Sequence, residues 1–170
     1  MLELRAVDSD DWAVRRELRR AAPAEASYAF GSTLAQWQGA GDREERWRAR
    51  LGIPGAHDVV AVVDGRPAGM ASGVPVTDAE DRVELISMWV SPEARGRGVG
   101  DSLVGEVVRW AVARGAKSLR LSVMPDNGRA VALYARNGFT DAGVPVAAQR
   151  DGAGASAGTG AERAMVMDLR

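Results

Sequence analysis

The fold is decided by the stretch Val90-Ser91-Pro92-Glu93-Ala94-Arg95-Gly96-Arg97-Gly98-Val99-Gly100. The residues before it, 83–90, are mainly apolar and predict a largely buried strand that ends at Pro92. In residues 98–113 the apolar side chains recur at intervals of three and four, which is typical of an amphipathic helix. The stretch is therefore a strand-to-helix turn that is rich in glycine and arginine.

A turn of this composition suits an anionic ligand. Glycine lets backbone N–H groups approach a phosphate closely, and the first turn of a helix adds unpaired N–H donors at the positive end of its dipole. Arg95 and Arg97 add two cationic side chains. The sequence therefore predicts a phosphate-binding site at this turn.

Two familiar glycine-rich phosphate loops do not fit the spacing. A dinucleotide-binding Gly-x-Gly-x-x-Gly pattern would need glycine at Asp101 or at Leu103, depending on where it starts. A P-loop would need a lysine at the start of the helix, where the chain has Gly100-Asp101-Ser102. Both nucleotide-binding alternatives are disfavoured.

On the N-terminal side, alternation predicts a strand over 2–7, followed by a helix from Trp12 to Ala21. A second helix is expected over about 33–51, with a break near Gly39-Ala40-Gly41. The β-branched run 58–63 is joined by the two-residue turn Asp64-Gly65 to a strand over 66–76, which predicts an antiparallel hairpin.

On the C-terminal side, residues 117–124 predict a strand parallel to 83–90, because the intervening helix has the length of a crossover connection. A shorter helix over 127–137 and a strand starting at Phe139 follow. A closing strand over 164–169 is expected to pair with 144–147, and the glycine-rich residues 150–160 between them are expected to form a flexible hairpin loop.

The composition favours one globular domain spanning 1–170 and argues against several kinds of partner. Lys and Arg total 22 against 23 Asp and Glu, so no basic excess indicates nucleic-acid binding. With no cysteine and only His57, a metal site is not expected; His57 itself is interpreted as a loop residue. No apolar run long enough to cross a membrane and no signal core is present, so a cytoplasmic location is expected, and the Ala, Gly and Arg usage suggests a bacterial, high-GC genome.

The turn resembles the signature of the GNAT superfamily of acyl-coenzyme A dependent N-acyltransferases, Gln/Arg-x-x-Gly-x-Gly/Ala, which Arg95, Gly98 and Gly100 match. A second motif of that family, Asn-x-x-Ala-x-x-x-Tyr followed by Gly-Phe, is matched by Asn127, Ala130, Tyr134, Gly138 and Phe139. The resemblance implies a GNAT-like α/β fold: a mixed, mostly antiparallel central sheet with helices on both faces and a parallel pair splayed around an acetyl-coenzyme A (acetyl-CoA) site.

The resemblance also implies which residues bind the donor. The pyrophosphate would lie on the backbone amides of Gly96 to Asp101 and on Ser102, and a bulge near the end of the 83–90 strand would free main-chain groups for the pantetheine. The full set of cofactor-binding candidates is Met88, Trp89, Val90, Arg95, Gly96, Arg97, Gly98, Val99, Gly100, Asp101, Ser102, Asn127, Ala130 and Tyr134.

Two residues are candidates for catalysis. Tyr134 occupies the position of the family's general-acid tyrosine, although a buried tyrosine that only packs its ring is the alternative. Glu84 matches a position where many members have a glutamate acting through water, and strict alternation would put it on the face of Ile86 and Met88; a solvated glutamate is the alternative. Asn127 suits a helix N-cap as well as a pantetheine contact. Other members carry their glutamate where this chain has Ser122.

The acceptor is the least specified part of the reaction. Tyr28, Phe30 and Trp37, with Trp47, fall in the family's variable acceptor wall, although tryptophans at helical spacing are more often core residues. A small-molecule amine is the preferred acceptor class, with a protein or peptide N-acetyltransferase or a non-catalytic acetyl-CoA binding module as alternatives. The resemblance is also compatible with a homodimer.

Overall fold

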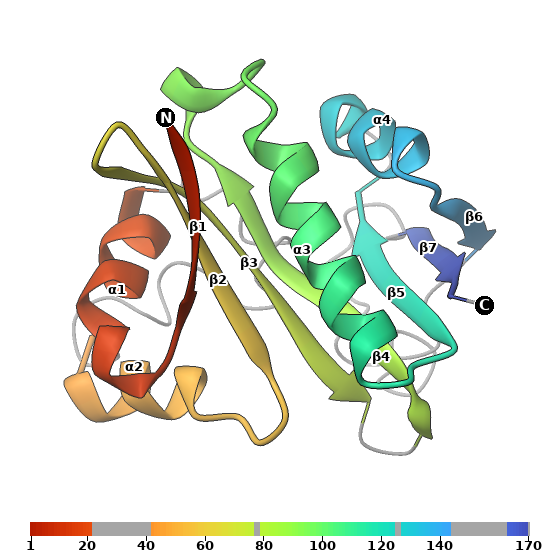
Figure 1. The fold of residues 1–170 in the computed structure, drawn as a ribbon, viewed down its shortest axis with the longest axis horizontal. Helices are drawn as coiled ribbons and strands as arrows, with labels where there is room; N and C mark the ends of the chain where they lie inside the picture. Colours follow the sequence, from red (N-terminus) through yellow and green to blue (C-terminus); the bar gives the residue numbers. More distant parts are fainter. Residues whose placement is uncertain (22–41, 77–78, 125–126, 144–162, 170) are drawn as a thin grey trace.

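A computed structural model describes residues 1–21, 42–76, 79–124, 127–143 and 163–169, without side chains at 79 and 80. These residues form one seven-stranded sheet in the order β1-β2-β3-β4-β5-β7-β6 (Figure 1). Its strands are β1 (Leu2–Val7), β2 (His57–Val63), β3 (Arg66–Val76), β4 (Ala79–Val90), β5 (Ser118–Val123), β6 (Thr140–Gly143) and β7 (Arg163–Asp168). The helices are α1 (Trp12–Ala21), α2 (Glu44–Leu51), α3 (Val99–Ala113) and α4 (Gly128–Arg136), with short 3-10 turns at Ser9–Asp11 and Pro92–Ala94.

The sheet is mostly antiparallel, with β4 and β5 as its parallel pair, as predicted. Helix α3 is the crossover between these two strands. The parallel ladder joins only Arg82–Glu84 to Ser118–Arg120, and β5 then continues to Val123 paired with β7 on its other side. From Leu85 onward, β4 therefore has no ladder to β5, and the two strands diverge (Figure 1).

A β-bulge at Ser87 changes which side chains of β4 face each side of the sheet. Met70 pairs with Trp89 and Ser72 with Ile86, so Ala71 of β3 lies opposite two residues of β4. Ser87 has a φ of 56°, in the left-handed region that non-glycine residues rarely adopt. The extra residue moves Met88 onto the face that Val83 and Leu85 occupy, and Trp89 onto the opposite face.

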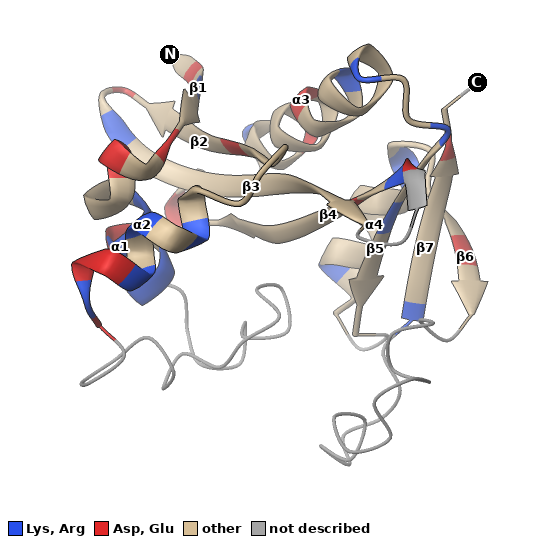
Figure 2. Cartoon of the chain, turned by 90° about the horizontal axis from the view of Figure 1, so that it is seen from below, with Lys and Arg blue, Asp and Glu red and all other residues tan. Residues whose placement is uncertain are grey.

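Helices cover both faces of the sheet, as predicted, with α3 on one face and α1 and α2 on the other (Figure 2). The larger core lies beneath α3 and contains fully buried Leu103, Val107 and Leu119. The smaller core, against α1, joins Leu18 to Trp89 and other apolar side chains of the sheet. Burial of each large aliphatic side chain contributes roughly 1.5–3 kcal/mol, which holds the helices to the sheet.

Most local predictions are confirmed, and the one that places His57 in a loop is wrong. The Asp64-Gly65 hairpin connects β2 and β3 as expected. The closing strand β7 pairs along its whole length with β5 and also pairs with β6, while the 144–147 segment with which it was expected to pair lies outside the described residues. His57 begins β2 instead of lying in a loop. The expected start of the second helix at 33–41 and the expected loop at 150–160 also lie outside the described residues.

Candidate active site

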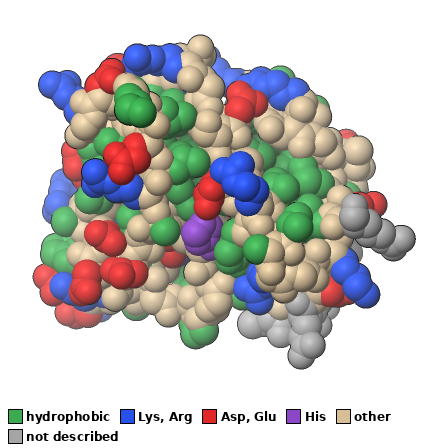
Figure 3. All heavy atoms as spheres, viewed as in Figure 1, with side chains coloured by type: hydrophobic (Ala, Val, Ile, Leu, Met, Phe, Trp, Pro, Cys, Tyr) green, Lys and Arg blue, Asp and Glu red, His purple; other side chains and the backbone are tan. Residues whose placement is uncertain are grey.

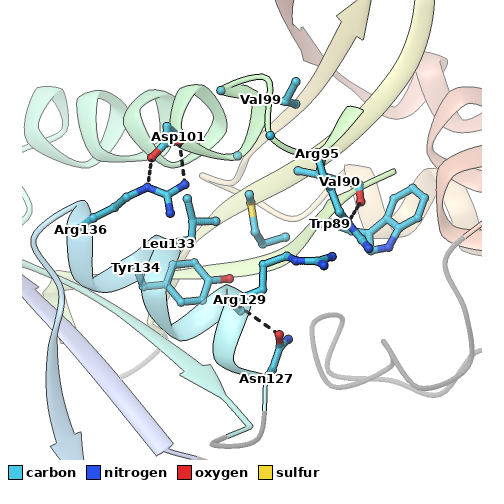
Figure 4. A pocket seen from close by; sticks show the side chains of 15 residues that line it. Trp89, Val90, Arg95, Val99, Asp101, Asn127, Arg129, Leu133, Tyr134 and Arg136 are labelled. Atoms are coloured by element: carbon cyan, nitrogen blue, oxygen red, sulfur yellow. Dashed lines mark hydrogen bonds and ion pairs between the residues drawn. The ribbon is translucent and has the colours of Figure 1, made fainter. Parts of the chain in front are cut away.

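A cavity of about 330 Å³ opens where β4 separates from β5, between the start of α3 and the side of α4 (Figure 4). Its walls come from the end of β4, the turn after it and one face of α4. The lining residues are Met88, Trp89, Val90, Arg95, Gly96, Gly98, Val99, Gly100, Asp101, Asn127, Arg129, Ala130, Leu133, Tyr134 and Arg136. Most of the predicted cofactor-binding residues therefore meet at one site, although they span almost fifty positions of sequence.

The β4 wall offers main-chain groups to the cavity. The amide of Ser91 donates to the carbonyl of Ala68 at 2.8 Å, so the backbone groups of odd-numbered residues there face β3. Because backbone groups alternate along an antiparallel strand, the N–H and carbonyl of Val90 face away from β3, toward the gap left by β5. The Val90 carbonyl accepts a hydrogen bond from Arg95 Nε at 3.1 Å.

The glycine turn lines one edge of the cavity with backbone N–H groups. Gly96 and Gly98 have φ values of 78° and 80°, and Gly98 is the N-cap of α3, so a side chain at either position would be strained. The first helical bond is donated by the amide of Ser102 to Gly98 O at 3.0 Å. The amides of Val99, Gly100 and Asp101 precede that bond and have no acceptor within the helix.

The charges around the cavity mouth also favour an anion. Burial lowers the pKa of Arg95, and the nearby Arg129 guanidinium lowers it further. Neither arginine forms an ion pair with a carboxylate among the described residues. The two positive charges repel each other, so a phosphate or similar anion between them would stabilise both. Arg129 was not singled out in the sequence because its position between Asn127 and Ala130 is a variable one in the motif.

Asp101 has an acidic side chain at this edge, and Arg136 neutralises it. Nε and Nη2 of Arg136 each donate to the Asp101 carboxylate at 2.9 Å, and Asn137 Nδ2 donates to it at the same distance. These bonds hold the pKa of Asp101 below its usual value, Arg136 having the largest effect. The contact joins the first turn of α3 to the end of α4, where Leu133 packs against Gly100.

Tyr134 points from α4 into the cavity and is 6% exposed (Figure 4). Its ring packs edge-on against Phe139, with the ring centroids 5.8 Å apart. Burial raises the pKa of the phenol well above its ordinary value of about 10. The hydroxyl therefore keeps its proton at neutral pH. At the start of the same helix, Asn127 caps α4: its side-chain oxygen accepts a hydrogen bond from the amide of Ala130 at 3.3 Å. This is the predicted capping role.

Some predicted residues do not line the cavity. Arg97 lies outside it with its guanidinium 3.8 Å from Asp64, and Ser102 uses its amide within the helix. Glu84 also lies outside, and its predicted face is wrong: the bulge at Ser87 separates it from Met88 and leaves it on the face of Ile86 and Trp89. Glu84 is the last residue of β4 that pairs with β5.

The predicted acceptor-binding residues Tyr28, Phe30 and Trp37 lie outside the described residues. Trp47 is 1% exposed and donates from Nε1 to Asp42 at 2.8 Å. It is therefore a core residue of α2, which is the alternative that its helical spacing favoured.

The face of the sheet opposite α3 holds a buried polar cluster that sequence patterns did not reveal. Arg15 of α1 and Arg50 of α2 approach Asp58 of β2, Ser72 of β3 and Ser87 of β4. Arg15, Asp58, Ser72 and Ser87 are each at most 3% exposed. The five residues come from five separate elements, so no local spacing connects them.

The surface on the α3 side carries charges of both signs (Figure 3). On the α3 face, acidic and basic side chains are interspersed, and His57 lies beside both kinds (Figure 3). His57 Nε2 is 3.3 Å from Glu106 Oε1, and its ring stacks on Trp110. Within the described residues, no three His, Asp or Glu side chains gather as metal ligands would. None of the described helices has the length and apolar character needed to cross a membrane.

Sequence comparison assigns this fold and site to a class of enzyme. A sequence model of the acetyltransferase (GNAT) family matches residues 11–139, which include β4, the glycine turn, α3 and α4. The chain belongs to this acetyltransferase family. It is 30% identical over 132 residues to an L-2,4-diaminobutyric acid acetyltransferase from Nocardia farcinica, covering 67% of this chain and 68% of that one.

Solved structures agree with the assignment. A nourseothricin acetyltransferase is 35% identical, with a TM-score of 0.57 over 69% of this chain and 67% of its own. A PaiA N-acetyltransferase from Thermoplasma acidophilum, solved in complex with coenzyme A, has a TM-score of 0.72 over 99% of both chains. At 16% identity, that second likeness shows the shared fold alone.

The raised pKa of Tyr134 gives a spectroscopic prediction. Because burial disfavours the phenolate, ultraviolet difference spectra between the wild type and Tyr134→Phe should show no phenol ionisation from neutral pH up to about 10 in the folded protein. The same shift affects the free energy of unfolding. Because the pKa of Tyr134 is higher in the folded protein than in the unfolded chain, its contribution to stability is present below the unfolded pKa and is lost as the pH rises through the folded pKa. A tyrosine transition near pH 10 in the folded wild type that is missing from Tyr134→Phe would contradict the buried environment.

Proposed function

We propose that this chain transfers an acetyl group from acetyl-CoA to a primary amine of a small molecule. The observation that carries the proposal is the convergence, in one cavity, of the released edge of β4, the amides at the start of α3 and the hydroxyl of Tyr134. Each of these supplies a different requirement of acyl transfer from a thioester. Membership of the acetyltransferase family supports the same reaction.

The residues at the cavity fit an acyl-CoA donor. Amides of residues 98–101 would hold the pyrophosphate, with Arg95 and Arg129 adding positive charge. Main-chain groups of Met88 and Val90 would pair with the amide-bearing pantetheine, as an added strand does. The Val90 N–H faces the gap and would stabilise the negative charge that develops on the thioester oxygen. Asn127, Ala130 and Leu133 close the other wall.

The transfer requires two proton movements. The amine nitrogen bonds to the acetyl carbon as the carbon–sulfur bond breaks; the nitrogen loses a proton and the departing sulfur gains one. Tyr134 is the proposed proton donor to the sulfur, because its hydroxyl points into the cavity and remains protonated. Glu84, where β4 and β5 begin to separate, is the proposed acceptor of the amine proton through water.

Donor binding tests the anion-binding turn. Gly98→Glu places a carboxylate at the helix start, where like-charge repulsion of several kcal/mol should weaken acetyl-CoA binding by more than about 100-fold in calorimetry. Gly115→Glu is the matched control, since Gly115 has a similar φ of 83° but lies just after the far end of α3. Equal binding by the two variants, or no binding of acetyl-CoA by the wild type, would refute the donor site.

Turnover tests the general acid. In an assay of coenzyme A release over a panel of amines, amino acids and short peptides, Tyr134→Phe should lower kcat by about 100-fold or more, the usual contribution of a positioned proton donor. The variant keeps the ring that packs on Phe139, so its thermal midpoint serves as the control for folding. Unchanged kcat would remove Tyr134 from the mechanism. A chain that binds acetyl-CoA and acetylates none of the amines would instead be a binding module.

A further inference from the structure

The polar cluster behind β4 is the strongest feature that the donor site does not use. Arg50 Nη2 donates to Ser87 Oγ at 2.9 Å, and its Nη1 lies 3.4 Å from Asp58 Oδ1. Arg15 Nη1 lies 3.9 Å from the same Asp58 oxygen and donates to Ser72 Oγ at 3.2 Å. The two guanidinium groups therefore converge on a single carboxylate oxygen, beneath α1 and α2.

This cluster has an excess of positive charge. Among the described residues, Asp58 is the only carboxylate that forms an ion pair with Arg15 or Arg50. Burial lowers the pKa of Arg15 to about 9, with the charge of Arg50 adding to the effect. Burial also lowers the pKa of Arg50. Within the described part of the chain, two buried cations share one anion and leave a positive charge uncompensated, and a buried charge is costly unless it is paired. One further anion would stabilise the cluster.

The cluster adjoins the donor cavity through the bulged end of β4. Ser87, which Arg50 contacts, is the bulged residue of β4, next to Met88 of the donor cavity. Of the two arginines, Arg50 is the one that a ligand can reach, since its side chain is 14% exposed and that of Arg15 is 2% exposed. An anion at Arg50 would therefore lie across β4 from the thioester.

A second, independent observation indicates a missing hydrogen-bond acceptor on this face. Trp89 is 6% exposed, and its indole Nε1 has no hydrogen-bond partner among the described residues. The bulge places its ring on the side of α1, away from Tyr134 and Leu133 (Figure 4). Trp89 lies two residues after Ser87, so the unpaired indole N–H and the serine that Arg50 contacts both belong to the bulged end of β4.

We propose that the acceptor carries a carboxylate, and that Arg50 and Trp89 Nε1 bind it while the amine is acetylated. The acceptor class is then an amine that also carries a carboxylate, as an amino acid does. A carboxylate supplies the one negative charge that the cluster lacks, and its two oxygens accept from a guanidinium and an indole N–H together. This inference rests on the proposed amine acetyltransferase function and specifies its substrate.

Matched pairs of acceptors test the carboxylate directly. L-2,4-diaminobutyrate, L-ornithine and L-lysine are compared with 1,3-diaminopropane, putrescine and cadaverine, which lack only the carboxylate. A hydrogen bond to a charged group adds to the binding free energy. We therefore expect kcat/KM for each amino acid to exceed that of its diamine by about tenfold or more. In the presence of coenzyme A, the amino acids and not the diamines should also raise the thermal midpoint.

Variants connect this selectivity to the cluster. Arg50→Gln should raise KM for the amino acids about tenfold and leave the diamines unchanged, while Arg50→Lys should keep part of the preference. Trp89→Phe retains an aromatic ring and removes the N–H, so it should reduce the preference even if Arg50→Gln does not fold. Arg48→Gln is the control, because Arg48 lies on the same helix but pairs with Asp10 and Glu44 at the surface. It should leave KM unchanged both for the amino acids and for the diamines.

The outcomes separate this inference from the function on which it rests. Equal kcat/KM within each pair, or a loss in Arg50→Gln that is the same for amino acids and diamines, overturns the carboxylate site and leaves acetyl transfer intact. Failure of the wild type to acetylate any amine overturns both proposals.

Discussion

The extra residue at Ser87 of β4 is the constraint on which both sides of the site depend. It gives Ser87 a left-handed backbone conformation, and it moves Met88 to the α3 face and Trp89 to the α1 face. Because β4 loses its ladder to β5 just before this point, its backbone groups are free to face a ligand. On the other side of the strand, the Ser87 hydroxyl accepts a hydrogen bond from Arg50. One irregular residue therefore shapes the donor cavity and anchors the buried arginine cluster.

The cavity keeps its shape because charged contacts hold its walls together. Asp101 at the start of α3 accepts from Arg136 and Asn137 near the end of α4, which fixes the helix that carries Tyr134. The pairing also neutralises a carboxylate that would repel an anion at the glycine turn. Arg95 and Arg129 remain available at the cavity mouth, while Arg15 and Arg50 serve the opposite face. These four arginines thus lie on two sides of β4, at the two places where we propose that anions bind.

Local patterns predicted most of the residues that line the cavity, and long-range geometry explains what they missed. The hairpin at Asp64-Gly65, the start of α3 at Gly98 and the capping by Asn127 each depend on residues close in sequence, and the structure confirms them. The face of Glu84 was predicted wrongly because alternation fails across a bulge. The Arg15, Arg50 and Asp58 cluster could not be predicted, since its members meet only through tertiary packing, and Arg50 resembles a solvated residue of a charged helix.

The central claim is that the released edge of β4 and the start of α3 form one donor site. The most direct test is to follow the backbone amide resonances by NMR during a titration with acetyl-CoA. The account predicts that the amides of Val90, Gly98 and Gly100 shift together with a single affinity, while those of β1 and of the Asp64-Gly65 turn remain unchanged. Shifts confined to other strands, or an unaffected Val90 amide alongside shifting glycines, would contradict it.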